Sequence, residues 1–169
     1  ALGEITGSFE EAVMESGKVL AIYGQVLPST LTNVQLVGEL EDPETGAIRR
    51  IIGESELTNT PGRIHRVWLD PANTPAYPPA ISAILNADLI LIGPGSLFTS
   101  LLPNLLVGGL ADAIQSSRAE KYFICNVATE RGETDGFNAS DHLKVIEQHL
   151  GRDLFDLVIC NRNFRGKLG

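Results

Sequence analysis

The part of the chain best suited to chemistry is a turn rich in glycine and hydroxyl groups, which follows an apolar run at residues 88–92. The glycines allow positive φ angles and a close approach of the backbone to a ligand. The hydroxyl groups lie where a helix begins, and the free N–H groups at such a position favour an anion. Phosphate binding and a plain strand-to-helix turn both fit, because the segment matches neither glycine-rich phosphate motif. The candidate ligand-binding residues of this turn are Gly93, Pro94, Gly95, Ser96, Thr99 and Ser100.

Polar residues also follow two later apolar runs of the chain. Asn126 comes directly after the first run, and its amide can read a base or a sugar. The alternative for Asn126 is a local bond that caps the strand end, and this is the preferred interpretation for Asn161. The loop at residues 132–136 is long enough to fold over a ligand, with Thr134 and Asp135 as its contacts. A turn stabilised by either side chain is the equal alternative.

The remaining reactive side chains form no recognisable site. The three histidines share no metal-ligand spacing, and we find no catalytic residue and no catalytic carboxylate pair. Cys125 and Cys160 lie inside apolar runs, which predicts two buried thiols in a reducing cytosol rather than a disulfide or a metal site. The sequence therefore predicts ligand binding at the strand ends, with no resident metal.

Three apolar runs and the helical segments between them must position these residues. The runs at 88–92, 122–125 and 157–160 are typical of strands buried on both faces. A short helix at 80–86 comes first, a helical stretch at 97–117 joins the first two runs, and a helix at 139–150 joins the last two. Ser140 is the expected cap of that last helix, and Gly151 its end. This order predicts two βαβ units, a parallel sheet and right-handed crossovers, with ligands beyond the carboxyl ends of the strands.

The first part of the chain has a different pattern. A capping box at Ser8 predicts a helix over residues 9–16. Short β-rich runs at 19–26, 34–40, 48–57 and 63–69 then alternate with turn sequences at 41–46 and 59–62. We expect a small, mostly antiparallel sheet in which the run at 63–69 is an edge strand. The fold class is therefore α/β, with a parallel sheet preceded by a small β-rich segment.

The composition of the chain argues against several classes of function. The chain has 169 residues, of which 43% are hydrophobic, and a net charge of −8. A negative charge argues against binding to nucleic acids or anionic membranes, which need positive potential. No run approaches the length that spans a bilayer, and the first residues have no signal-peptide pattern. We expect a cytoplasmic protein, and because no initiator Met is present, a chain that starts inside a longer protein.

Two long motifs carry a family resemblance. Residues 93–104 read GPGSLFTSLLPN, and residues 124–137 read ICNVATERGETDGF, followed by Asp141 and His142. Together with residues 22–30, they resemble the gluconeogenesis factor family (YvcK type), which shares a CofD-like superfamily and a Rossmann-like fold with 2-phospho-L-lactate transferase. The family usually has Tyr where Phe98 stands. The transferase usually carries Ser-Asn-Pro after Gly-Pro, whereas this chain has Gly95, Ser96 and Leu97, which favours the first branch.

The resemblance implies a regulatory protein that binds a nucleotide-sugar, of the UDP-N-acetylglucosamine type, and acts in carbon metabolism and cell-shape control. The alternative is a transferase that moves a phospholactyl group to a deazaflavin and uses Mg²⁺. The resemblance also implies a Rossmann-like, three-layer parallel sheet of the CofD-like kind. The chain would be a fragment of one such domain, with a capping helix and β-rich part at 1–79 and a βαβαβ half at 80–169. The family's N-terminal glycine-rich strand-loop and its C-terminal helices would be missing. An exposed sheet edge would then favour a homo-oligomer or a domain swap.

Overall fold

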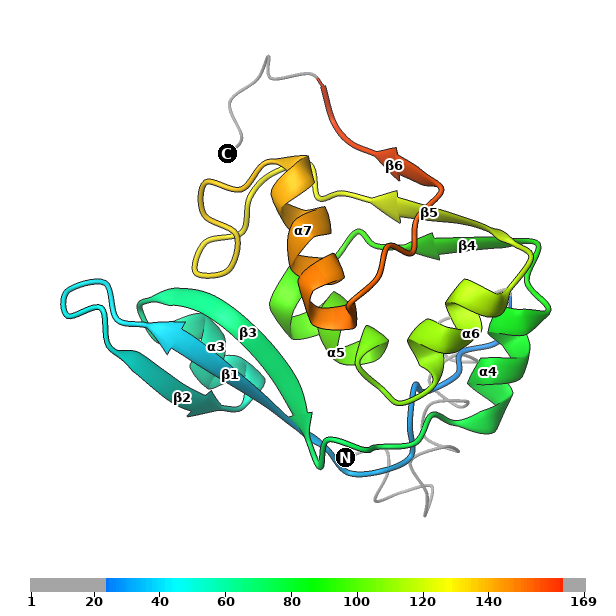
Figure 1. Cartoon of the computed structure of the whole chain (residues 1–169), viewed down its shortest axis with the longest axis horizontal. Coiled ribbons are helices and arrows are strands. Elements are labelled where there is room, and N and C mark those ends of the chain that lie inside the picture. Colours follow the sequence, from blue (N-terminus) through cyan, green and yellow to red (C-terminus); the bar gives the residue numbers. More distant parts are fainter. Residues whose placement is uncertain (1–23, 163–169) are drawn as a thin grey trace.

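A computed structural model describes residues 24–162 of the chain. These residues form two separate three-stranded sheets, one from the first half of the described chain and one from the second half (Figure 1). The predicted helix at 9–16 and most of the predicted strand at 19–26 lie outside the described residues, and residues 25 and 26 are not in a strand. None of the helices in the described part is long and apolar enough to cross a membrane.

The first sheet is antiparallel, as its sequence predicts. Its central strand β1 (Gln35–Glu41) pairs with β2 (Ile48–Ile52) on one side and with β3 (Arg63–Asp70) on the other. The turn at 41–46 closes the β1–β2 hairpin, and the Asp42 carboxylate accepts the N–H groups of Glu44 and Thr45. The strand at 63–69 was expected at an edge, and the observed order confirms that position for β3.

A short helix, α3 (Glu54–Asn59), replaces the second half of the strand predicted at 48–57. Gly53 has a φ of 102°, which leaves the extended conformation and ends β2 after Ile52. Leu57 of α3 is fully buried and packs against Gly38 of β1, where a larger residue would clash. The gain from burying Leu57 explains why a helix forms here. The turn at 59–62 therefore joins α3 to β3 and is not a hairpin.

The second sheet is parallel, as two βαβ units require. Strand β5 (Glu120–Ile124) pairs in parallel with β4 (Leu89–Ile92) on one side and with β6 (Leu157–Ile159) on the other. The helical stretch predicted at 97–117 consists of three short helices. In chain order the elements are α4 (Pro78–Leu85), β4 (Leu89–Ile92), η1 (Leu97–Leu101), α5 (Leu102–Leu105), α6 (Leu110–Ser116), β5 (Glu120–Ile124), α7 (Ala139–Leu150) and β6 (Leu157–Ile159).

The ends of α7 follow capping rules, with one correction. The N-cap is Asn138 and not Ser140, because the Asn138 side chain accepts the N–H groups of Ser140 and Asp141. Asp141 in return accepts the N–H of Asn138 at 3.0 Å, which completes a capping box. Gly151 ends the helix in the left-handed conformation, with a φ of 68°, as predicted.

One face of the parallel sheet is open in the described residues, whereas the apolar runs predicted burial on both faces. Ile90 and Phe123 point inward and are buried, but Leu91 is 53% exposed and Ile159 is 45% exposed. The topology explains this. Both crossovers step in the same direction, from β4 to β5 and on to β6, and right-handed crossovers of that kind place their helices on the same face.

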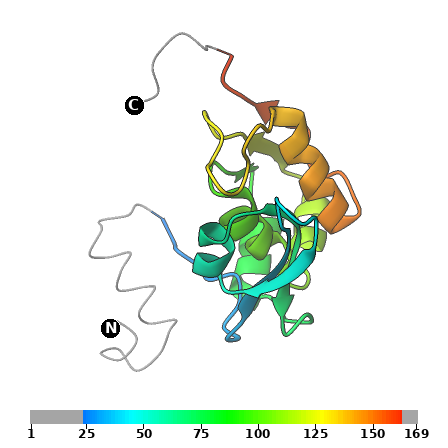
Figure 2. The same ribbon diagram turned by 90° about the vertical axis from the view of Figure 1, so that its left-hand side faces the viewer.

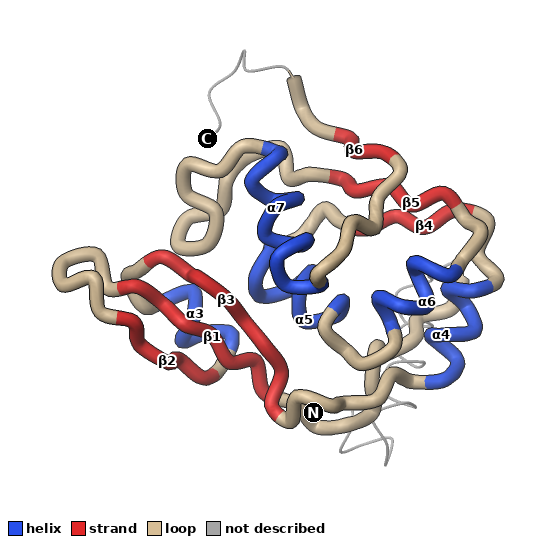
Figure 3. Tube along the Cα trace, in the orientation of Figure 1, coloured by secondary structure: helices blue, strands red, loops and turns tan. Residues whose placement is uncertain are grey.

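Helices α5 and α7 lie between the two sheets (Figure 3). His149 connects α7 to the first sheet by a hydrogen bond. Its Nε2 atom accepts the backbone N–H of Val67 in β3 at 3.0 Å, and its Nδ1 atom donates to the carbonyl of Val145 at 2.7 Å. These partners require the neutral ring, because a protonated imidazole has no acceptor for Val67. Burial lowers the pKa of His149, and the nearby charge of Arg66 lowers it further, although the bond to Val145 opposes both.

Stability should therefore fall as the pH falls from 6.5, the ordinary pKa of histidine, toward the lower pKa of His149 in the folded chain. In that pH range the histidine side chain is protonated in the unfolded chain, whereas His149 stays neutral in the folded chain. We expect thermal unfolding, measured from neutral pH down to about pH 5, to occur at steadily lower temperature. The variant His149→Gln, whose amide can still accept from Val67, should have a flatter profile. Parallel profiles for the two proteins would contradict this role.

Candidate functional site

The loops that follow β4 and β5 meet at the carboxyl end of the parallel sheet, and Asn126 joins them. Its Oδ1 atom accepts the N–H of Gly95 at 2.9 Å, and its Nδ2 atom donates to the carbonyl of Gly95 at 3.0 Å. Asn126 thus contacts both polar groups of a single residue in the glycine-rich turn. The topology brings these residues together because parallel strands end at the same edge of a sheet.

Two glutamates that sequence analysis missed hold the rest of the turn. The hydroxyl of Ser96 donates to the Glu130 carboxylate at 2.7 Å. The Glu133 carboxylate accepts the backbone N–H of Phe98 at 3.0 Å and the hydroxyl of Thr99 at 2.5 Å. Glu133 therefore occupies, for these two donors, the place that an anion takes at the start of a helix. The sequence feature that could have indicated these contacts is a pair of acidic residues, three positions apart, in the loop that follows a buried strand.

Burial dominates the electrostatics of Glu133, whose residue is only 6% exposed. Removing the carboxylate from water raises the pKa of Glu133, and the neighbouring charge of Glu130 raises it further. The hydrogen bonds from Thr99 and Phe98 act in the opposite direction and lower the pKa. The net effect is a raised pKa, so Glu133 holds a proton to higher pH than an exposed glutamate does.

Gly93 and the end of the turn have purely backbone roles. Gly93 has a φ of 91°, and a Cβ atom at this position would lie 2.4 Å from the carbonyl oxygen of Ile124 in β5. Pro94 follows it through a cis peptide bond. Ser100 is exposed, and its carbonyl accepts the side-chain amide of Asn104 at 2.8 Å. Gly93 is thus the residue that allows the turn to pass directly beside β5.

The loop before α7 is held by its own side chains. The buried Thr134 hydroxyl accepts the N–H of Glu130 at 2.8 Å, and the exposed Asp135 carboxylate accepts the N–H of Gly132 at 2.7 Å. Gly132 lies against α3, because a Cβ atom there would be 3.0 Å from the Thr58 carbonyl. Figures 1 and 2 show this yellow and orange loop beside the first sheet and α3.

A cavity of about 550 Å³ opens between this loop, α7 and the start of β3. It contains two cationic side chains, Arg63 and Lys144, and Lys144 lies 3.4 Å from the Asp141 carboxylate. The cavity is lined by Gly62, Arg63, Gly132, Glu133, Asp135, Gly136, Phe137, Asp141, Lys144, Val145 and Gln148. Of the predicted site residues only Asp135 lines it, so the cavity lies beside the glycine-rich turn and not within it.

The predicted residues thus lie in one region of the structure, but they make different kinds of contact there. Gly95, Ser96 and Asn126 lie at the junction of the two loops. Thr99 contacts Glu133, and Thr134 and Asp135 hold the loop itself. Within residues 24–162, no three His, Cys, Asp or Glu side chains are grouped so that they could hold a metal ion.

One prediction about the thiols is wrong. Cys125 is buried, as expected, but Cys160 is exposed. The reason is its position: β6 is an edge strand that ends at Ile159, so Cys160 lies just beyond the last paired residue.

His142, in the first turn of α7, is a buried polar side chain. It is 4% exposed, and its Nε2 atom has no hydrogen-bond partner among the described residues.

Comparison with solved structures supports this fold. A crystal structure of a UPF0052-family protein from Bacillus halodurans at 2.60 Å resolution superposes with a TM-score of 0.86 and 43% sequence identity. The match covers 98% of this chain and 52% of that protein.

Curated relatives point to the same family. A Nostoc protein is 50% identical over 163 residues, which is 96% of this chain and 35% of the relative. The gluconeogenesis factor of Bacillus subtilis is 44% identical over 161 residues, or 95% of this chain and 49% of its own length. The chain thus spans half or less of these two relatives. Residues 1–167 match the family described as 2-phospho-L-lactate transferase CofD. The chain belongs to the CofD family, and gluconeogenesis factors are among its relatives.

Proposed function

We propose that this chain is the part of a gluconeogenesis factor that binds a nucleotide-sugar, of the UDP-N-acetylglucosamine type, in a regulatory role that requires no reaction. The observation that carries the proposal is the junction of two loops at the carboxyl end of the sheet, fixed by the two hydrogen bonds between Asn126 and Gly95. Open α/β sheets bind their ligands at this end. The names of the relatives support the regulatory role in carbon metabolism.

The ligand would bind through the residues of the junction that still have donors to offer. The first N–H groups of a helix have no partner within the helix. Since Glu133 takes the N–H of Phe98, those of Ser96 and Leu97 are the donors for a diphosphate. The Ser96 hydroxyl could turn from Glu130 to the ligand. Gly93 and Gly95, on either side of Pro94, have no side chains and so leave room for the ligand close to the backbone. Thr99, Ser100, Asn126, Thr134 and Asp135 would shape the site around the sugar and base.

Binding of UDP-N-acetylglucosamine, measured by calorimetry on the longer protein, tests this site. We expect Ser96→Ala to weaken binding by about 1–3 kcal/mol, roughly 5- to 150-fold in Kd, because a hydrogen bond to a charged group is lost. Ser116→Ala is a matched control, since Ser116 is exposed on α6, at the opposite end of the sheet. An unchanged Kd in Ser96→Ala would show that the ligand does not bind at this turn.

The transferase is the second candidate, and the description of the matched family favours it. It would move a phospholactyl group from a nucleotide diphosphate to a deazaflavin, with Mg²⁺ balancing the phosphate charge. Thermal shift separates the two, because a ligand of the native state raises the melting temperature. We expect a rise with UDP-sugars. A rise only with the transferase substrates and Mg²⁺ would favour the transferase instead.

We also propose a cytoplasmic location for the protein. Self-association, as a homo-oligomer or by a domain swap, would use the edge strands β4 and β6 of the parallel sheet, which have backbone groups left to pair on one side in the described residues.

A further inference from the structure

The two cysteines of the chain directly follow two neighbouring strands, β5 and β6. Strands β5 and β6 pair in parallel, with Phe123 opposite Val158 and Ile124 opposite Ile159. The next residue on each strand is a cysteine, and the Cys125 N–H donates to the Ile159 carbonyl at 2.9 Å, which continues the ladder. Cys125 and Cys160 are therefore opposite each other where the sheet ends.

When the alternation of β5 and β6 is continued by one residue, both thiols fall on the same face of the sheet. Side chains alternate between faces along a strand, so Cys125 shares the face of Phe123, and Cys160 shares the face of Val158. Phe123 and Val158 are themselves a pair on one face. Neighbouring strands are about 4.8 Å apart, and a disulfide joins residues whose Cα atoms are about 4.4–6.8 Å apart. The spacing of these two positions thus allows a disulfide.

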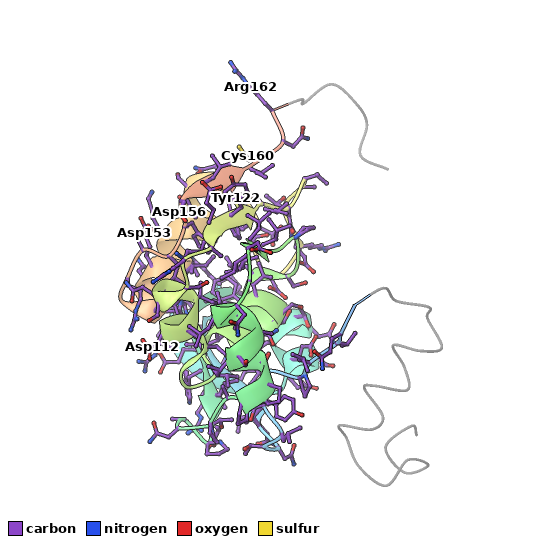
Figure 4. All side chains as sticks on the ribbon, turned by 90° about the vertical axis from the view of Figure 1, so that its right-hand side faces the viewer. Asp112, Tyr122, Asp153, Asp156, Cys160 and Arg162 are labelled. Atoms are coloured by element: carbon purple, nitrogen blue, oxygen red, sulfur yellow. The ribbon has the colours of Figure 1, made fainter. Side chains whose placement is uncertain are left out.

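The two sulfurs differ in access, which gives each a separate role. Cys160 lies at the outer end of β6, on the surface (Figure 4), whereas Cys125 is buried. Because Cys160 follows the last paired residue of an edge strand, its backbone can adjust toward Cys125 without breaking the sheet. Burial raises the pKa of the Cys125 thiol, and the nearby Cys160 raises it further.

We propose that Cys125 and Cys160 form a redox-active pair, in which a peroxide oxidises Cys160 and Cys125 then closes an intramolecular disulfide. In the first step the Cys160 thiolate attacks a peroxide oxygen. The O–O bond breaks, the sulfur becomes a sulfenic acid, and the peroxide is reduced to an alcohol or water. In the second step the Cys125 sulfur displaces the hydroxyl group from the sulfenic acid. The Cys125 proton leaves with that hydroxyl as water, and the S–S bond forms.

This disulfide would act directly on the candidate site. Cys125 precedes Asn126, the residue that joins the two loops at the carboxyl end of the sheet. A bond from Cys125 to Cys160 would fix the end of β6 beside that junction. Oxidation of the pair would therefore change the carboxyl end of the sheet through a covalent bond.

Oxidation of the reduced chain with hydrogen peroxide, followed by alkylation and tryptic digestion, tests the proposal. Cleavage after Lys121, Arg131, Arg152 and Arg162 releases peptides 122–131 and 153–162, which contain one cysteine each. We expect these two peptides to appear as one disulfide-linked species that is absent when the digest is reduced. The linked species should come from monomeric protein on a non-reducing gel.

Single variants separate the roles of the two thiols. Cys160→Ser should abolish the linked species and leave Cys125 as an alkylated thiol. Cys125→Ala should leave Cys160 as a sulfenic acid that dimedone captures. In the unsubstituted chain, either a dimer linked through Cys160 or a Cys160 sulfinic acid beside a free Cys125 thiol would overturn the proposal.

Discussion

Replacing Gly93 with alanine is expected to lower the free energy of unfolding by about 2–5 kcal/mol, a large part of the stability of an ordinary domain. Two costs add at this position. A positive φ of 91° is unfavourable for alanine, by roughly 1–2 kcal/mol. The new Cβ atom would also lie 2.4 Å from the Ile124 carbonyl oxygen, and this backbone atom cannot move without shifting β5. Overpacking of this kind costs a further 1–3 kcal/mol or so.

Gly151→Ala is the control, because Gly151 is in the left-handed conformation, with a φ of 68°, but nothing lies within 4 Å of its added Cβ. It should show the conformational cost alone, about 1–2 kcal/mol. Urea unfolding of both variants, followed by the fluorescence of Trp68 and by circular dichroism, measures the difference. Equal losses in the two variants would mean that the turn can move away from β5, and that Gly93 is not needed for close packing.

Removing the carboxylate of Glu133 should also destabilise the chain strongly. In Glu133→Ala the N–H of Phe98 and the hydroxyl of Thr99 lose their common acceptor in a buried position. An unsatisfied buried polar group costs about 1–3 kcal/mol, so we expect a loss of about 2–4 kcal/mol in the free energy of unfolding, measured by urea unfolding. Glu133→Gln keeps one acceptor and the shape of the side chain, and should recover much of the loss.

Glu130→Ala controls for the removal of an acidic residue from the same loop. Glu130 is only partly buried and accepts the hydroxyl of Ser96, which can turn to water instead. We expect a loss below about 1 kcal/mol for Glu130→Ala. If Glu133→Ala proved no more costly than Glu130→Ala, the buried carboxylate would not be what holds the start of η1.

The parallel sheet could be predicted because each of its strands is recognisable from a short stretch of sequence. Three apolar runs, each followed by polar residues, define β4, β5 and β6 without knowledge of their neighbours. The cap of α7 was misplaced by two residues, since Asn138 and Ser140 are both good caps and only the structure shows which one accepts the N–H groups of the first turn. Helix α3 was missed because its burial depends mainly on Leu57, which packs on Gly38 in another element.

The sequence predicted that the candidate residues lie at the carboxyl end of the sheet, but it did not predict their contacts with one another. Asn126 and the glycine-rich turn were both expected at the carboxyl end of the sheet, and their direct pairing follows from that shared position. The role of Glu133 could not be foreseen in the same way. Its partners Phe98 and Thr99 are more than 30 residues earlier, and a glutamate in a polar loop is normally solvated. Only the fold places that loop over the start of η1.

The attachments of the loop before α7 constrain how its length can change. Glu130 contacts the glycine-rich turn, Gly132 lies against α3, and Glu133 reaches the start of η1. These three contacts come from nearly consecutive residues and point to different parts of the fold. An inserted or deleted residue among them would shift at least one contact out of reach, whereas many side-chain exchanges elsewhere in the loop would be absorbed. Loop grafting in this chain should therefore preserve the residue count of this segment, even where its composition is redesigned.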